Sequence, residues 1–140
     1  MKSPMDESHV EDAAFGWLAE SGYNVVHGND ISPDSPNPER TNNGQVLLLH
    51  RFQSALERLN PHLSTDVLEE VLRKLQQSDS PDLLLENRRL HQYFVEGLEV
   101  EVIREDGSIG GDRAYFFDYE NPAENDWLAV RQFTVIEKRN

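Results

Sequence analysis

Apolar residues recur at helical spacing through the first two-thirds of the chain and change to strand spacing after it. A first helix is predicted after Ser8, because Ser8 and Glu11 have the spacing of a capping box and an apolar stripe follows. The stripe consists of Val10, Ala13, Ala14, Trp17 and Leu18. Gly22 ends this helix, and Trp17 is expected to be buried with the stripe.

A short strand is predicted over residues 23–26, followed by a long Pro/Asn/Asp-rich loop over residues 27–44. The second helix begins at Gln45. It ends at Asn60-Pro61, because the residue before a proline disfavours the helical conformation.

Two further helices follow in the middle of the chain. One begins near Ser64 or Thr65 and places an apolar stripe on one face. For the next, Ser80 is the expected N-cap and Pro81 the first-turn proline, and Gly97 is the expected end.

After Gly97 the period changes to two, and Asp106-Gly107 is typical of a hairpin turn. The predicted strands cover residues 98–103, 114–119 and 127–137. The last is a long apolar edge strand that stops close to Asn140, which suggests a continuation. The pattern therefore predicts an α+β fold with four helices followed by an antiparallel sheet.

Composition adds limits on function. The chain has 140 residues with 26 acidic and 13 basic side chains, a net charge of -13, and this opposes unaided tight binding to nucleic acid. It has no cysteine, which excludes disulfides and thiolate metal sites. No secretory signal is visible, and no apolar stretch approaches the roughly 20 residues of a membrane span. A soluble cytoplasmic protein without membrane contact is expected.

Local signatures of the common nucleotide-binding and hydrolase sites are absent. The sequence contains neither a P-loop Gly-Lys-Ser/Thr nor the Gly-x-Gly-x-x-Gly, His-Glu-x-x-His and Gly-x-Ser-x-Gly motifs. The five histidines have no metal-ligand spacing, and no Asp/Glu-x-Lys occurs. No catalytic residue is therefore predicted within the chain.

The candidate DNA contacts are Arg40, Arg88 and Arg89. Adjacent arginines on a helix point to different sides, and pairing with neighbours such as Glu86 explains Arg88 and Arg89 more simply. Residues 96–126 carry ten acids against two arginines. This stretch is expected to serve solubility, with a cation site or a mimic of DNA charge as alternatives.

Several motifs occur in a fixed order from one end of the chain to the other. They are Trp17-Leu18 with Gly22-Tyr23, Pro38-Glu39-Arg40, Leu59-Asn60-Pro61, Asn87-Arg88-x-Leu90-His91, Phe117-Asp118-x-x-Asn121-Pro122 and Asn125-Asp126-x-Leu128-Ala129-Val130-x-Gln132-Phe133-Thr134-Val135. Together they resemble the N-terminal domain of the restriction (R) subunit of type I restriction-modification enzymes, from about residue 10 to residue 140.

The resemblance implies that the chain is the front part of a PD-(D/E)xK restriction-endonuclease-like domain, with residues 1–140 forming a single domain. Family members continue into a Pro-Asp and then a Glu-x-Lys on the following strands, where two carboxylates hold Mg²⁺ and the lysine stabilises negative charge. This chain ends at Asn140, so the catalytic strands and the motor domains are expected beyond it. Glu11 is the one metal-ligand candidate that carries over, and its capping role is the alternative.

The resemblance further implies a parent enzyme that cleaves unmodified duplex DNA with ATP-dependent translocation and works with methyltransferase and specificity subunits. Mg²⁺ and ATP would serve that full-length protein, and none is expected on this chain. The chain itself is expected to be an inactive scaffold that binds DNA weakly. The alternative is a free-standing acidic interaction protein or a DNA mimic that inhibits a DNA-binding enzyme, which the net charge favours.

Overall fold

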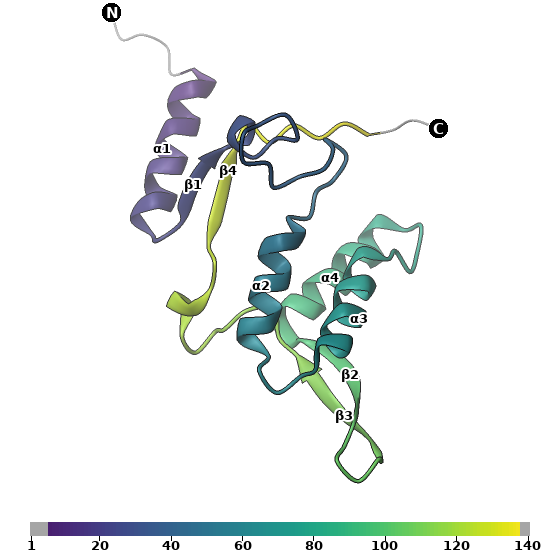
Figure 1. Cartoon of the computed structure of the whole chain (residues 1–140). Helices are drawn as coiled ribbons and strands as arrows, with labels where there is room; N and C mark the ends of the chain where they lie inside the picture. The colour runs from purple at the N-terminus through teal and green to yellow at the C-terminus, as the bar shows by residue number, and fades with distance from the viewer. Residues whose placement is uncertain (1–5, 138–140) are drawn as a thin grey trace, which may run out of the picture. The chain divides into compact units, whose positions relative to one another are not determined.

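The structure, a computed structural model, describes residues 6–137 (Figure 1). The fold is α+β, and the chain divides into two compact units. Unit 1 comprises the described residues up to Leu48 and from Asp126 onward, and unit 2 comprises Leu49–Asn125. The single domain over residues 1–140 and the PD-(D/E)xK relationship stay predictions.

Unit 1 is built on one parallel pair of strands. It contains α1 (Glu7–Glu20), β1 (Asn24–His27), the 3-10 helix η1 (Gly28–Asp30) and β4 (Leu128–Arg131). Asn24 lies beside Leu128 and His27 beside Arg131 in the parallel register. Figure 1 shows α1 lying along these two strands.

The expected order of four helices followed by one antiparallel sheet is therefore wrong in two respects. β1 precedes three of the helices, and β4 pairs with β1 rather than with the hairpin. β4 is also shorter than the predicted strand over residues 127–137. Period-two alternation identifies a strand but not its partner, and a parallel partner always lies far away in sequence.

The start of α1 corrects the predicted capping box. Asp6 is the N-cap, and its Oδ1 accepts a hydrogen bond from the His9 backbone N–H at 3.1 Å. Ser8 lies inside the helix, and its hydroxyl donates to Asp6 Oδ1 at 2.7 Å. An aspartate caps as well as a serine and adds a negative charge at the positive end of the helix dipole.

The inner face of α1 also differs from the prediction. The partly buried positions are Glu11, Ala14, Phe15 and Leu18. Trp17 is 69% exposed, so the expectation that it is buried with the apolar stripe is wrong. α1 carries apolar residues on two adjoining stripes, and only packing against β1 and β4 selects between them.

Unit 2 combines three helices with a hairpin. Its elements are α2 (Leu49–Leu59), α3 (Thr65–Gln76), α4 (Leu83–Glu96), β2 (Leu98–Ile103), β3 (Ile109–Ala114) and the 3-10 helix η2 (Pro122–Glu124). α3 packs on β2. Buried apolar side chains from these elements and the segments between them form the core of the unit, namely Leu56, Leu63, Leu68, Val71, Leu75, Leu98, Val100, Ala114 and Phe116.

The hairpin turn forms at Asp106-Gly107 as predicted, but the second strand begins earlier in the sequence than predicted. Gly107 adopts φ 82° in the turn, and its N–H donates to the Arg104 carbonyl at 2.9 Å. Ile103 then faces Ile109 directly, so β3 covers Ile109–Ala114 and not residues 114–119. The tight turn sets the register, which brings the weak strand formers Gly110 and Gly111 into the sheet.

Helix ends in unit 2 follow the sequence with two exceptions. α2 begins at Leu49 and not at the predicted Gln45, because Gln45 belongs to the loop, where its carbonyl accepts from Arg40. α2 stops before Asn60, Ser64 caps α3, and Gly97 with φ 82° ends α4. Ser80 is not the cap of α4, because Asp82 Oδ1 accepts from the Leu84 backbone N–H at 2.9 Å. Within residues 6–137, no helix is long and apolar enough to cross a membrane.

Glu86 links the start of α4 to the segment before it. Its Oε1 accepts from the backbone N–H groups of Asp79 and Ser80, each at 3.0 Å, and its Oε2 lies 2.8 Å from Arg89 Nη2. The hydrogen bond from Arg89, supported by the Asp79 amide, lowers the pKa of Glu86. A carboxylate whose pKa is lower in the folded state stabilises the fold at pH values above its unfolded pKa. This stabilisation is lost as the pH falls through the folded pKa.

We therefore expect Glu86→Gln to lower the thermal midpoint of the chain at pH 7 and to have little effect in acid. The difference between the two proteins should shrink as the pH falls below the normal glutamate pKa of about 4.3. Thermal unfolding of both proteins at several pH values checks this. A difference that stays constant down to pH 2 would show that the carboxylate charge is not what stabilises this link.

Candidate functional site

The Glu11 carboxylate lies between α1 and the end of β4. Both of its oxygens accept from the side-chain amide of Gln132, at 3.0 Å and 3.1 Å. Arg131 Nη2 lies 3.4 Å from Glu11 Oε2, and the glutamate side chain is 21% exposed. A carboxylate with little solvent around it is thus satisfied by one amide and one cation.

Arg131 ties a second acidic residue of α1 to the same place. Its Nη2 lies 2.8 Å from Asp12 Oδ1, and its guanidinium sits over the Phe15 ring at 5.4 Å from the centroid. The Asp12 hydrogen bond, followed by the charge of Glu11, raises the pKa of Arg131. Arg131 therefore remains charged and holds both carboxylates next to β4.

The backbone at the end of β4 makes a sharp turn at Gln132. Gln132 has φ 55°, and it is the only residue other than glycine with a positive φ in the described part of the chain. A Cβ on Gly28 would lie 2.2 Å from the Gln132 carbonyl oxygen, so this close approach requires glycine at position 28. The turn is therefore packed tightly against the start of η1.

Glu11 does not play the capping role expected for it. The cap of α1 is Asp6, and the Glu11 carboxylate points to Gln132 and Arg131 instead. Residues 6–137 contain no group of three or more His, Asp or Glu side chains that could hold a metal ion. The two carboxylates here, Glu11 and Asp12, are both paired with the Arg131 guanidinium, so the residues present do not fit a magnesium ion by themselves.

Arg40 has a structural position. It is 3% exposed, and its guanidinium donates to three backbone carbonyls, those of Gln45 at 2.8 Å, Asn43 at 2.9 Å and Thr134 at 2.8 Å. It also lies over the Phe133 ring at 4.0 Å from the centroid. The loop over residues 31–48 is thereby joined to the segment after β4, and the guanidinium is not accessible to a DNA phosphate.

The two arginines on α4 have different surroundings. Arg89 donates to the Lys74 and Gln77 carbonyls at the end of α3 and pairs with Glu86. The Glu86 hydrogen bond raises the pKa of Arg89, so this arginine serves as a charged link between two helices. Arg88 is exposed and is the only one of the three arginines predicted to contact DNA that offers its side chain freely to solvent.

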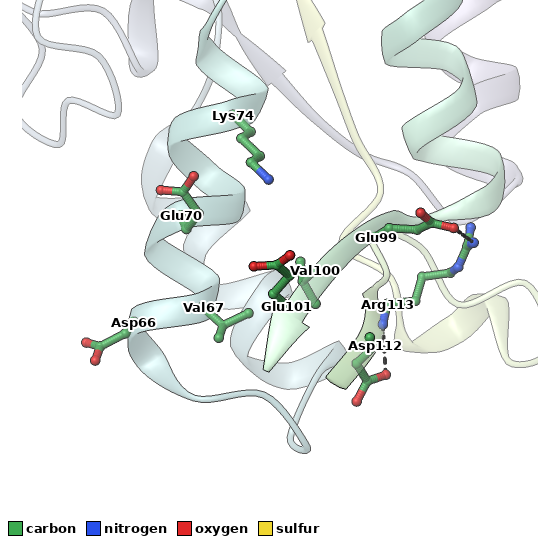
Figure 2. A pocket seen from close by; sticks show the side chains of 10 residues that line it. Asp66, Val67, Glu70, Lys74, Glu99, Val100, Glu101, Asp112 and Arg113 are labelled. Carbon is green, nitrogen blue, oxygen red and sulfur yellow. Dashed lines mark hydrogen bonds and ion pairs between the residues drawn. The ribbon is translucent and has the colours of Figure 1, made fainter. Parts of the chain in front are cut away.

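Unit 2 carries an open groove of about 930 Å³ between α3 and the hairpin (Figure 2). Acidic and basic side chains line it, namely Asp66, Glu70, Glu99, Glu101 and Asp112 against Lys74 and Arg113. Figure 2 shows Arg113 turned toward Glu99, with which it forms an ion pair at 3.0 Å. The strands and helix that form the groove thus present a mainly acidic surface.

Comparison with known proteins identifies the family. Residues 4–140 match the family described as type I restriction enzyme R protein N terminus. The chain belongs to this family. The resemblance that the motifs indicated is therefore confirmed over almost the whole chain.

Two relatives of the R protein N-terminal family illustrate the match. A Methanocaldococcus jannaschii protein named as a type I restriction enzyme MjaIXP endonuclease subunit is 28% identical over 126 residues, which cover 90% of this chain and 12% of that protein. The type I restriction enzyme HindI endonuclease subunit of Haemophilus influenzae is 22% identical over 135 residues, which cover 96% of this chain and 13% of that protein. The chain thus spans about an eighth of the length of these relatives. No solved structure matches it.

Within this R protein N-terminal chain, the sequence pointed to Glu11 but missed its partners. Gln132 belongs to the longest motif of the resemblance, yet nothing local connects it to Glu11, 121 residues earlier. Arg131 lies at the end of a predicted strand and has no distinguishing sequence signal. The only sequence hint of such a partner was the pair of adjacent acids Glu11 and Asp12, which favours a basic residue near them in the folded chain.

Proposed function

We propose that the chain forms the N-terminal region of the R subunit of a type I restriction enzyme and serves there as a scaffold for the nuclease domain. The observation that carries the proposal is the family match over residues 4–140, supported by two relatives that are endonuclease subunits by name. In this proposal the full subunit cleaves unmodified DNA, translocates it with ATP, and works with methyltransferase and specificity subunits. The free-standing acidic protein or DNA mimic has no comparable support.

The geometry of unit 1 is compatible with a scaffold. β1 and β4 form a parallel pair, and within residues 6–137 no third strand extends it. Parallel sheets are normally larger and covered on both faces by helices, and here α1 packs on a pair of only two strands. We propose that the following strands of the nuclease domain extend this sheet and carry its catalytic residues.

The proposal places the cofactors outside this chain. The described residues contain no group of three or more His, Asp or Glu side chains that could hold a metal ion, and the sequence contains no P-loop. Mg²⁺ and ATP would therefore be bound by later parts of the subunit. With its net charge of -13, the chain alone is expected to bind DNA weakly and to lose that binding at physiological salt.

The test uses an R subunit that carries this chain as its N-terminal region, assembled with its methyltransferase and specificity subunits. Removing residues 1–140 should abolish cleavage of unmodified DNA and leave DNA-dependent ATP hydrolysis within about twofold, because the motor is a separate domain. The 140-residue chain alone should neither nick plasmid with Mg²⁺ nor hydrolyse ATP. Both activities are measured on the same unmodified plasmid, with modified plasmid as the control.

Cleavage that survives the deletion would contradict the proposal. Submicromolar binding of the isolated chain to a random duplex at about 150 mM salt would contradict the expected weak DNA contact.

A further inference from the structure

Three unusual features meet at the end of β4. A carboxylate that is 21% exposed directs both oxygens to one amide, the residue bearing that amide has a left-handed backbone, and the turn passes close to a glycine. Residues other than glycine are uncommon in the left-handed region and remain there only where their surroundings hold them. Here the surroundings are Glu11 and Gly28.

The hydrogen bonds explain what holds the turn. Gln132 itself is exposed, so burial of its side chain does not fix the backbone. Its amide nitrogen reaches both oxygens of Glu11, which makes a charge-assisted bond, and such bonds are stronger than neutral ones. Arg131, one residue earlier, binds the same helix through Asp12 and Glu11. The last residues of β4 and the first turns of α1 are therefore joined at two consecutive positions.

We propose that Glu11 and Gln132 form a latch in which Gln132 is a positioning residue. The latch sets the direction in which residues 132–135 leave β4, and Glu11 acts through this latch instead of as a magnesium ligand. The relevance of that direction rests on the proposed function, because the catalytic strands would follow this segment. The latch itself depends only on contacts within unit 1.

An exchange of the two side chains tests the latch in the 140-residue chain. Gln132→Glu places two carboxylates face to face and should lower the thermal midpoint by about 4 °C, because like charges repel and the bond is lost. Combining it with Glu11→Gln restores an amide facing a carboxylate, with donor and acceptor exchanged. The double variant should recover most of the lost midpoint.

The matched control uses the neighbouring acid. Asp12 is 63% exposed and contacts Arg131 but has no bond to Gln132. Asp12→Asn combined with Gln132→Glu should therefore leave the midpoint low. Recovery that is equal in the two double variants, or absent from the Glu11→Gln double variant, would overturn the latch.

Activity of the assembled restriction complex supplies the second arm. Gln132→Gly keeps the left-handed backbone without strain and removes the amide, so the ratio of cleavage to ATP hydrolysis should fall about tenfold while ATP hydrolysis is unchanged. The exchanged pair, Gln132→Glu with Glu11→Gln, should show a ratio of cleavage to ATP hydrolysis near the wild-type value. A double variant that recovers its midpoint but not its cleavage would overturn the positioning role, because the carboxylate on α1 would then be required in its own right.

The two arms separate this inference from the proposed function. If the wild-type assembly does not cleave DNA, the proposed function fails, and the midpoints of the isolated chain still decide whether the latch exists.

Discussion

Replacing Arg40 by methionine is expected to reduce the free energy of unfolding by on the order of 3 kcal/mol. The guanidinium is buried and donates to three backbone carbonyls, which belong to the loop and to the segment after β4. Methionine fills similar space but removes three hydrogen bonds from a charged donor, and such bonds contribute about 1.5–3 kcal/mol each, at the low end here because the carbonyls are only partly buried. Urea unfolding of the two proteins measures the difference.

Two variants sharpen the Arg40 result. Arg40→Lys should recover little stability, because one ammonium group cannot reproduce the planar fork that reaches three carbonyls. Arg88→Met, at an exposed arginine of α4, should change the free energy of unfolding by less than about 0.5 kcal/mol. A lysine variant as stable as the wild type would show that the fork geometry is unimportant and only the charge matters.

Replacing Asn60 by alanine is expected to cost about 3 kcal/mol of unfolding free energy. The side chain is fully buried at the end of α2. Its amide donates to the Leu56 carbonyl at 2.9 Å and the Tyr115 carbonyl at 2.8 Å, and its oxygen accepts from the Tyr115 N–H at 2.7 Å. Alanine leaves both backbone groups of Tyr115 without these partners. Unfolding in urea, followed by circular dichroism, checks the prediction.

The controls for Asn60 separate hydrogen bonding from loss of side-chain volume. Asn60→Asp keeps the shape but cannot donate to the two carbonyls, and it buries a charge, so it should be at least as destabilising as alanine. Asn87→Ala, on the exposed side of α4, should have little effect. A stable aspartate variant would contradict the assignment of the amide as donor.

Local signals in the sequence were sufficient for most helix and turn boundaries. Ser64, Asn60-Pro61, Gly97 and Gly107 each act through the conformation or hydrogen bonds of their own few residues. The prediction of Ser80 as the N-cap of α4 was wrong because Asp82, two residues away, is an equally good cap. The family was also readable, since its motifs keep their order along the chain.

Strand pairing and the surroundings of the charged residues were not readable in this way. β1 and β4 become neighbours although unit 2 lies between them in the sequence. Arg40 looked like a DNA contact because a surface and a buried arginine have the same sequence signal, and its Thr134 partner lies 94 residues away. The apolar stripe with Trp17 and the adjoining stripe with Phe15 both occur on α1, so packing alone decided which one faces the strands.

The sequence by itself determined the family, the helices of unit 2 and the hairpin turn, because each depends on residue order or on contacts within about one helical turn. The sequence also pointed to Glu11, but left two roles open for its side chain, a helix cap and a metal ligand. Only the tertiary structure supplied Arg131 and Gln132 as the partners of that carboxylate. Hydrogen bonds between residues 121 positions apart form only after α1 packs against β4, and no local pattern encodes them.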